Sequence, residues 1–93
     1  MAVSVRIPTI LRSYTEGASE VSVEPDVATL QGVLDALEAA APGIGARVLD
    51  DSGALRRFVN VYVDDDDVRF LDGLATPVGD GSQISIIPAV AGG

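Results

Sequence analysis

The sequence of 93 residues contains no cysteine, no histidine and no lysine, and its six positive charges are all arginine. These absences exclude a thiolate nucleophile, an imidazole base, a Schiff-base amine and any metal site built from cysteine and histidine. A disulfide framework is excluded as well. We therefore do not expect a self-sufficient enzyme, a resident metal or a bound cofactor.

Positive charge is scarce, because six arginines face fourteen acidic residues and the formal net charge is −8. Such a balance repels phosphate backbones and anionic lipid, so neither nucleic acid nor a membrane surface is an expected partner. A partner with a basic patch is favoured instead. The sequence has no apolar run near the ~20 residues of a membrane span and no apolar leader near Met1. We expect a single cytoplasmic domain that is monomeric when free.

Alternation of apolar and polar residues predicts strands over residues 3–7, 20–24, 58–63 and 83–87. Residues 68–70 are expected to form a short strand that pairs back across a turn of four aspartates. Leu30, Val33, Leu34 and Leu37 follow a helical period, which predicts a helix over residues 30–41 with Thr29 as its N-cap. Gly32 lies inside this helix, where glycine is unfavourable, and so indicates close packing by a neighbour. The connection over residues 44–57 has weak helical character, and its contacts are not predicted.

The order of these elements is strand, strand, helix, strand, short strand, strand. One amphipathic helix can cover only one face of a mixed sheet of four or five strands. The expected fold class is therefore α+β, a β-grasp or ubiquitin-like roll over residues 1–88 with a tail over residues 89–93. The expected core faces the helix and consists of Val3, Val5, Ile7, Val21, Val23, Leu30, Val33, Leu34, Leu37, Val59, Val61, Val63, Ile84 and Ile86.

The chain ends in Gly92 and Gly93. Two terminal glycines would be unremarkable in a frayed tail, but they also suit a terminal carboxylate that must enter a narrow enzyme channel, because they carry no Cβ. Ala89, Val90 and Ala91 precede them, and five extended residues reach about 17 Å from the domain. We therefore expect Gly93 to be the reactive position.

Three segments carry a family resemblance: residues 5–12 (VRIPTILR), 57–63 (RFVNVYV) and 88–93 (PAVAGG). With these, the chain resembles the ubiquitin-like sulfur carriers of the MoaD/ThiS family over nearly all its length, and is most similar to the cysteine-biosynthesis branch. The resemblance implies that an E1-like activating enzyme uses ATP to adenylate the Gly93 carboxylate, which a sulfur donor converts to a thiocarboxylate. It also implies transfer of this sulfur to O-phosphoserine on a pyridoxal-phosphate-dependent cysteine synthase, followed by release of cysteine by a metalloprotease. ATP and pyridoxal phosphate then belong to the partner enzymes.

The same sequence features are compatible with three functions other than sulfur transfer for cysteine biosynthesis. The chain could be the small subunit of molybdopterin synthase, a protein modifier conjugated through Gly93, or an interaction module with an inert tail. The absence of lysine excludes conjugation of one copy to a lysine side chain of another.

Arg6, Phe58, Tyr62 and Ile87 alternate with core residues and are predicted to project from the open face of the sheet. Exposed aromatic and aliphatic side chains beside an arginine suit a partner-docking surface. The alternative is that the first loop or residues 44–57 cover them as a second small core. Ile87 is the strongest docking candidate because it lies next to the tail.

The four aspartates of residues 64–67 lack the spacing, glycine and terminal glutamate of a calcium loop, which favours a solvated turn. Gly79, Asp80 and Gly81 lack the lysine and following helix of a phosphate loop and predict a turn.

Overall fold

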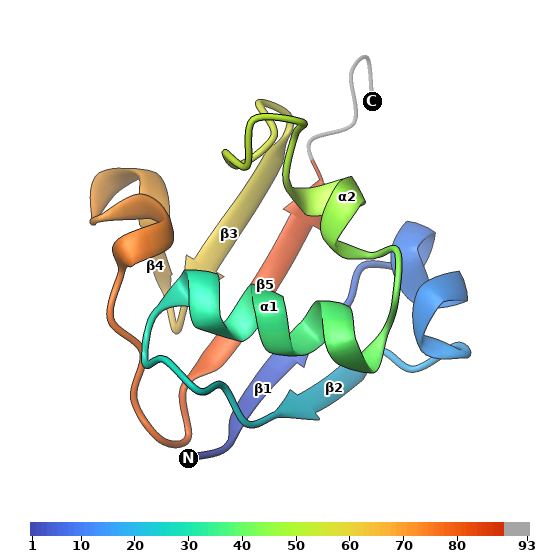
Figure 1. The fold of residues 1–93 in the computed structure, drawn as a ribbon, viewed down its shortest axis with the longest axis horizontal. Coiled ribbons are helices and arrows are strands. Elements are labelled where there is room, and N and C mark those ends of the chain that lie inside the picture. Colours follow the sequence, from blue (N-terminus) through green and yellow to red (C-terminus); the bar gives the residue numbers. More distant parts are fainter. Residues whose placement is uncertain (89–93) are drawn as a thin grey trace.

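The computed structural model describes residues 1–88, and the predicted tail of residues 89–93 lies outside them. Five strands form one sheet in the order β2-β1-β5-β3-β4 (Figure 1). Its strands are β1 (Val3–Arg6), β2 (Glu20–Val23), β3 (Val59–Val63), β4 (Asp66–Asp67) and β5 (Gln83–Pro88). The central pair β1 and β5 is parallel, and all other pairs are antiparallel. The predicted mixed sheet is confirmed.

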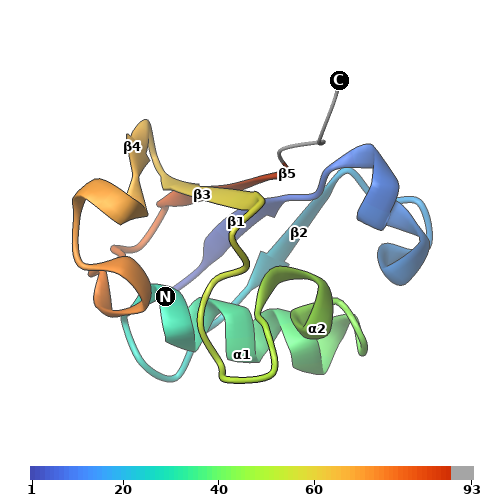
Figure 2. The same cartoon turned by 90° about the horizontal axis from the view of Figure 1, so that it is seen from above.

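Helices α1 (Leu30–Ala40) and α2 (Gly45–Val48) lie on the same side of the sheet (Figure 2). The Thr29 side chain accepts a hydrogen bond of 3.2 Å from the Gly32 backbone N–H, which confirms the predicted N-cap. After the helix, Gly43 adopts a φ of 98°, a conformation that favours glycine and reverses the chain. The helix therefore begins after its predicted cap and ends at Ala40, one residue before the predicted end.

The core lies between α1 and the sheet. Every predicted core residue is buried except Val21, which is partly buried and packs against the others. The sequence pattern did not identify six further buried hydrophobic residues: Leu11, Ala41, Ile44, Val48, Val68 and Val78. Five of them come from short or irregular segments, and Ala41 is the C-cap of α1.

The connection between β1 and β2 contains a 3₁₀ helix, η1 (Thr9–Thr15), that the sequence pattern did not predict. It buries Leu11, and the Tyr14 hydroxyl accepts a 2.7 Å hydrogen bond from Arg47 Nε. A 3₁₀ segment of this length has too few turns to give a helical periodicity. Its conformation is held by contacts with distant residues.

The predicted pairing of residues 68–70 is wrong. The paired segment is β4, which lies against Tyr62 and Val63, and Val68–Phe70 form a second 3₁₀ helix, η2. Asp64 has a φ of 56°, so the chain reverses at once and pairing begins within the acidic run. The Asp67 carboxylate then accepts a 2.9 Å hydrogen bond from the Arg69 N–H and caps η2.

The expectation that regular structure ends before Pro88 is also wrong, because Pro88 is the last residue of β5 and lies opposite Val59. A proline is tolerated at the end of a strand, where one missing N–H donor removes little of the ladder.

The connection over residues 44–57 packs on the helix side of the sheet, with Ile44 and Val48 fully buried. Its tip is an Asp50-centred turn: the carboxylate accepts hydrogen bonds from the Ser52 hydroxyl at 2.6 Å, the Ser52 N–H and the Ala54 N–H. The hydrogen bonds from Ser52 and Ala54 lower the pKa of Asp50 below its ordinary value. The carboxylate is thus kept ionised as the acceptor that closes this turn.

Candidate functional site

The open face of the sheet carries three of the predicted docking residues, Arg6, Tyr62 and Ile87, and Phe58 immediately precedes β3. Arg6 and Tyr62 both lie opposite Ser85 of β5, which places the three in one row across β1, β5 and β3. Ile87 lies opposite Asn60 in the neighbouring row, nearer the end of β5. The structure therefore brings residues far apart in sequence onto one surface, as the alternation predicted.

Two of these residues are large apolar side chains that remain exposed: Phe58 is 59% exposed and Ile87 is 48% exposed. The alternative in which residues 44–57 cover them is wrong, because that connection packs against α1 on the other face (Figure 2). We call Arg6, Phe58, Tyr62 and Ile87 the open-face patch.

A groove of about 610 Å³ adjoins this patch at the end of β5. Its walls come from the ends of β1 and β5, from the start of β2 and from η1, and both Arg6 and Arg12 line it. Arg12 Nε donates a 3.2 Å hydrogen bond to the Ile7 carbonyl oxygen. The sequence pattern missed Arg12 because its segment was expected to be an irregular connection. The groove residues are Arg6, Ile7, Pro8, Thr9, Arg12, Ser19, Glu20, Ser85, Ile86, Ile87 and Pro88.

Arg69 holds the chain that leads into β3. Its Nη2 donates hydrogen bonds to the carbonyl oxygens of Arg56, Arg57 and Val59, at 2.9, 3.1 and 2.8 Å. Its Nη1 donates to the Asn60 side-chain oxygen. One guanidinium therefore fixes the backbone on both sides of Phe58.

We expect Arg69→Ala to lower the free energy of unfolding by roughly 1–3 kcal/mol, because hydrogen bonds from a charged donor are lost together. Urea unfolding measures the change. Arg57→Ala is the matched control, since it removes the same charge from an exposed side chain without a side-chain hydrogen bond among residues 1–88. Equal losses in the two variants would show that charge, not the carbonyl contacts, is responsible.

The acidic run binds backbone amides. Asp64 accepts a 3.1 Å hydrogen bond from the Gln83 N–H, and Asp67 caps η2. Among the described residues, no group of three or more acidic side chains is arranged to hold a metal ion. No helix within residues 1–88 is long and apolar enough to cross a membrane. Asp80 accepts a 2.9 Å hydrogen bond from the Ala2 N–H, consistent with the predicted turn.

The predicted reactive tail, Ala89, Val90, Ala91, Gly92 and Gly93, lies outside the described residues. Pro88, the last described residue, ends β5 beside both the groove and the open-face patch. Fold and surface together define a ubiquitin-like β-grasp protein with an exposed apolar and basic patch where the chain continues into its Gly-Gly end.

Comparison with known proteins agrees with this class. The family model of the ThiS family matches residues 5–93. The chain is 54% identical to the sulfur carrier protein CysO of Mycobacterium tuberculosis over the full length of both chains. It is 43% identical to small archaeal modifier protein 3 of Haloferax volcanii over 68 residues, which is 73% of each chain. The chain belongs to the ThiS family.

A solved structure agrees in three dimensions. The crystal structure of the BexX/CysO complex of Amycolatopsis orientalis contains a chain that is 48% identical and superposes with a TM-score of 0.88. The match covers 98% of this chain and 99% of that one. The β-grasp fold and the resemblance to sulfur carriers are therefore confirmed.

Proposed function

We propose that this chain carries sulfur as a thiocarboxylate on Gly93. The observation that carries the proposal is the full-length similarity to a sulfur carrier protein, which extends through the Gly-Gly end. The composition supports it, because a chain without cysteine, histidine or lysine offers no comparable nucleophilic side chain. The chain is then a protein substrate of other enzymes, not an enzyme.

The chemistry takes place on the terminal carboxylate. In an E1-like activating enzyme, a Gly93 carboxylate oxygen attacks the α-phosphorus of ATP, and pyrophosphate leaves. A sulfur donor attacks the resulting acyl-adenylate, AMP leaves, and the carboxylate has exchanged one oxygen for sulfur. A thiocarboxylate is ionised at neutral pH and is a soft nucleophile, so it needs no side-chain base from the carrier. ATP is bound and consumed by the activating enzyme, and we place the cycle in the cytoplasm.

We propose cysteine biosynthesis as the destination of the sulfur. The thiocarboxylate sulfur forms a bond to the β-carbon derived from O-phosphoserine on a cysteine synthase, and phosphate leaves. Pyridoxal phosphate belongs to that synthase. A metalloprotease then hydrolyses the bond between Gly93 and the new cysteine, which restores the carboxylate. The 54% identity to CysO favours this branch over the small subunit of molybdopterin synthase.

The open-face patch is the proposed docking surface for the activating enzyme and the synthase. It supplies two exposed apolar anchors, Phe58 and Ile87, and the positive charge of Arg6, which lines the same groove as Ile87. Contacts of this kind dominate binding energy at protein interfaces. The relative from Amycolatopsis orientalis was solved in a complex with BexX, so a carrier of this fold does form a stable contact with a second protein.

Intact-mass spectrometry tests sulfur carriage. We expect incubation with ATP, sulfide and the activating enzyme to raise the mass by the difference between one sulfur and one oxygen. A later cysteinyl adduct, formed with O-phosphoserine and the synthase, would support the cysteine branch. An unmodified carboxylate after complete incubation would overturn the carrier function.

Ile87→Asp is expected to slow thiocarboxylate formation by roughly tenfold or more, because a charge replaces an interface anchor. The measurement is the initial rate of the mass change at limiting carrier concentration. Leu71→Asp is the matched control, since Leu71 is 47% exposed, follows η2 and is not one of the patch residues. Equal rates for the two variants would remove Ile87 from the docking surface.

A second function is favoured by one comparison. The 43% identity to a small archaeal modifier protein supports conjugation of Gly93 to other proteins. Target lysines bearing a diglycine remnant, found by peptide mass spectrometry in the chain's host, would establish it.

A further inference from the structure

Strand β2 forms an edge of the sheet. The Ile7 N–H donates a 2.8 Å hydrogen bond to the Ser19 carbonyl, and the register continues from there with Val5 opposite Val21 and Val3 opposite Val23. In an antiparallel pair, hydrogen-bonded positions alternate. The N–H and C=O groups of Glu20, Ser22 and Glu24 therefore point away from β1, where another strand could pair with them.

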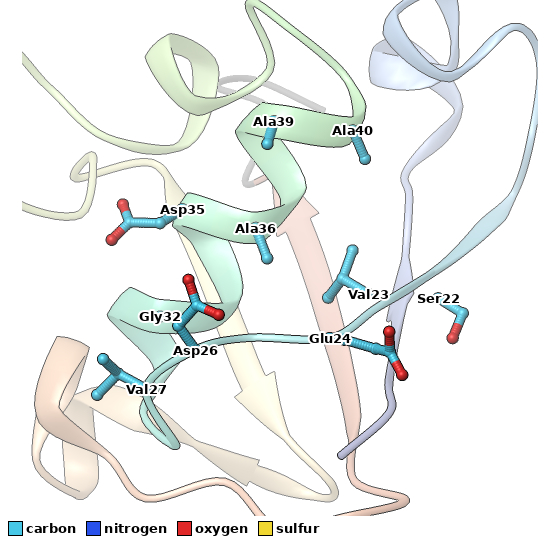
Figure 3. Close-up of a pocket in the computed structure, with 10 residues that line it drawn as sticks. All are labelled: Ser22, Val23, Glu24, Asp26, Val27, Gly32, Asp35, Ala36, Ala39 and Ala40. Atoms are coloured by element: carbon cyan, nitrogen blue, oxygen red, sulfur yellow. The ribbon is translucent and has the colours of Figure 1, made fainter.

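A groove of about 670 Å³ runs beside this edge, between β2 and α1 (Figure 3). Val23 and Ala36 face each other across it, and small residues of α1 leave it open. The groove is lined by Ser22, Val23, Glu24, Asp26, Val27, Gly32, Asp35, Ala36, Ala39 and Ala40. Three of these residues are acidic and none is basic.

We propose that the β2 edge binds an extended basic segment of a partner protein as an added sixth strand. Addition of a strand to an exposed edge is an established mode of peptide recognition, in which backbone hydrogen bonds supply affinity and side-chain pockets supply specificity. Here the edge supplies the backbone groups, and the adjoining groove supplies the pocket.

The register determines which residues the partner must carry. Partner residues opposite Val21 and Val23 would point toward α1, and the alanine-lined groove suits valine or isoleucine there. Residues opposite Glu20, Ser22 and Glu24 would lie on the open side, beside two carboxylates, where arginine or lysine forms favourable cross-strand pairs. The fitting segment therefore alternates basic and β-branched residues.

Charge repulsion disfavours a second copy of this chain as the strand that pairs with the β2 edge. If two β2 edges paired antiparallel about Ser22, Glu20 of each copy would lie opposite Glu24 of the other. Like charges directly opposite each other are destabilising. The same carboxylates that exclude a second copy attract a basic segment, so the edge selects its partner by charge.

Apart from Glu20, which lies opposite Arg6 of the open-face patch, this site is separate from that patch. Ser22 lies opposite Ser4, which pairs with Gln83 at the start of β5, whereas the chain leaves the sheet after Pro88 at the other end. The groove also lies on the helix side. A partner at the β2 edge could therefore stay bound while Gly93 is in use elsewhere, and the proposal does not depend on sulfur carriage.

NMR titration with a short peptide of alternating arginine and valine tests the proposal. We expect saturable shifts in the amides of Ser22 and Glu24 and in the methyl groups of Ala36 and Ala40. The control peptide has the same composition with arginines and valines in separate blocks. Equal binding of both peptides, or shifts spread over residues 64–67, would show unspecific attraction and overturn the proposal.

Variants separate the two parts of the interaction. Ser22→Pro removes an outward N–H that β1 does not use and should weaken peptide binding roughly fivefold to tenfold. The double variant Glu24→Lys, Asp26→Lys should weaken it at least about tenfold through charge repulsion. Asp65→Lys, between β3 and β4 at the opposite edge of the sheet, should change it little. Unchanged binding in the double variant would overturn the proposal.

Two further readouts complete the test. Shifts at β2 that depend on protein concentration without peptide would indicate self-pairing and overturn the choice of a basic partner. Thiocarboxylate formation should be unaffected in the double variant, so failure of strand addition and failure of sulfur carriage are distinguishable.

Discussion

Deletion of Gly93 is expected to abolish thiocarboxylate formation while leaving the thermal unfolding temperature almost unchanged. The deletion moves the terminal carboxylate back by one residue, about 3.5 Å, and misplacement of a reacting group by even 1 Å strongly slows a positioned reaction. Stability should persist because every residue of the core cluster lies between Val3 and Ile86. Intact-mass spectrometry after incubation with ATP, sulfide and activating enzyme, together with calorimetry, measures both effects.

A variant that keeps the chain length serves as the control for this deletion. Gly93→Ala retains the position of the carboxylate and adds one methyl group, so we expect slowed but detectable sulfur loading if the enzyme channel is narrow. Two results would contradict the interpretation. Unfolding of the deletion variant would make the tail part of the fold, and full sulfur loading would show that position 93 is not required.

Gly32→Ala is expected to destabilise the protein by about 1–3 kcal/mol, the range for forcing extra atoms into a packed site. Within most helices this substitution is stabilising, by roughly 1 kcal/mol. Here the sign reverses, because a Cβ at position 32 would lie 2.1 Å from the Val27 carbonyl oxygen. The backbone before α1 would have to move, and with it the Thr29 cap. Urea unfolding gives the change in free energy.

Gly79→Ala is the comparison for this variant. Its added Cβ would meet nothing closer than the Ser82 hydroxyl oxygen at 3.8 Å, and the position has no positive φ. We expect it to be neutral or slightly stabilising through reduced freedom of the unfolded chain. If Gly32→Ala proved as stable as Gly79→Ala, the close approach of Val27 to α1 would be disproved.

The parts of the fold with a clear repeat were predictable. Strands β1, β2, β3 and β5 and helix α1 each repeat a pattern over several residues, and the Thr29 cap marked the start of the helix. Gly32 was correctly interpreted as a close contact, although its partner, Val27, was not identifiable. The short segments were not predictable: η1 and η2 carry too few residues for periodicity, and Asp64 turned the chain earlier than its neighbours indicated.

The residues of the candidate site also fall into those that the sequence predicted and those that it missed. Arg6, Tyr62 and Ile87 were assigned to one face because strand side chains alternate, and the structure confirms that placement. Arg12 and the groove beside it were missed, because they depend on how η1 folds against the ends of β1 and β5. The hydrogen bonds from Arg69 to the carbonyl oxygens of Arg56 and Arg57 were missed for the same reason, because they join segments that come together only when the chain folds.

By itself, the sequence determined that this protein lacks cysteine, histidine and lysine, folds as a β-grasp domain and resembles carriers that react through a terminal glycine. These conclusions rest on composition, local periodicity and a matched ending, which are properties of the chain before it folds. Only the tertiary structure decided that the open-face patch stays uncovered, and that β2 forms an edge beside an acidic groove. Strand order and the packing of loops arise from contacts between distant segments, and no local pattern specifies them.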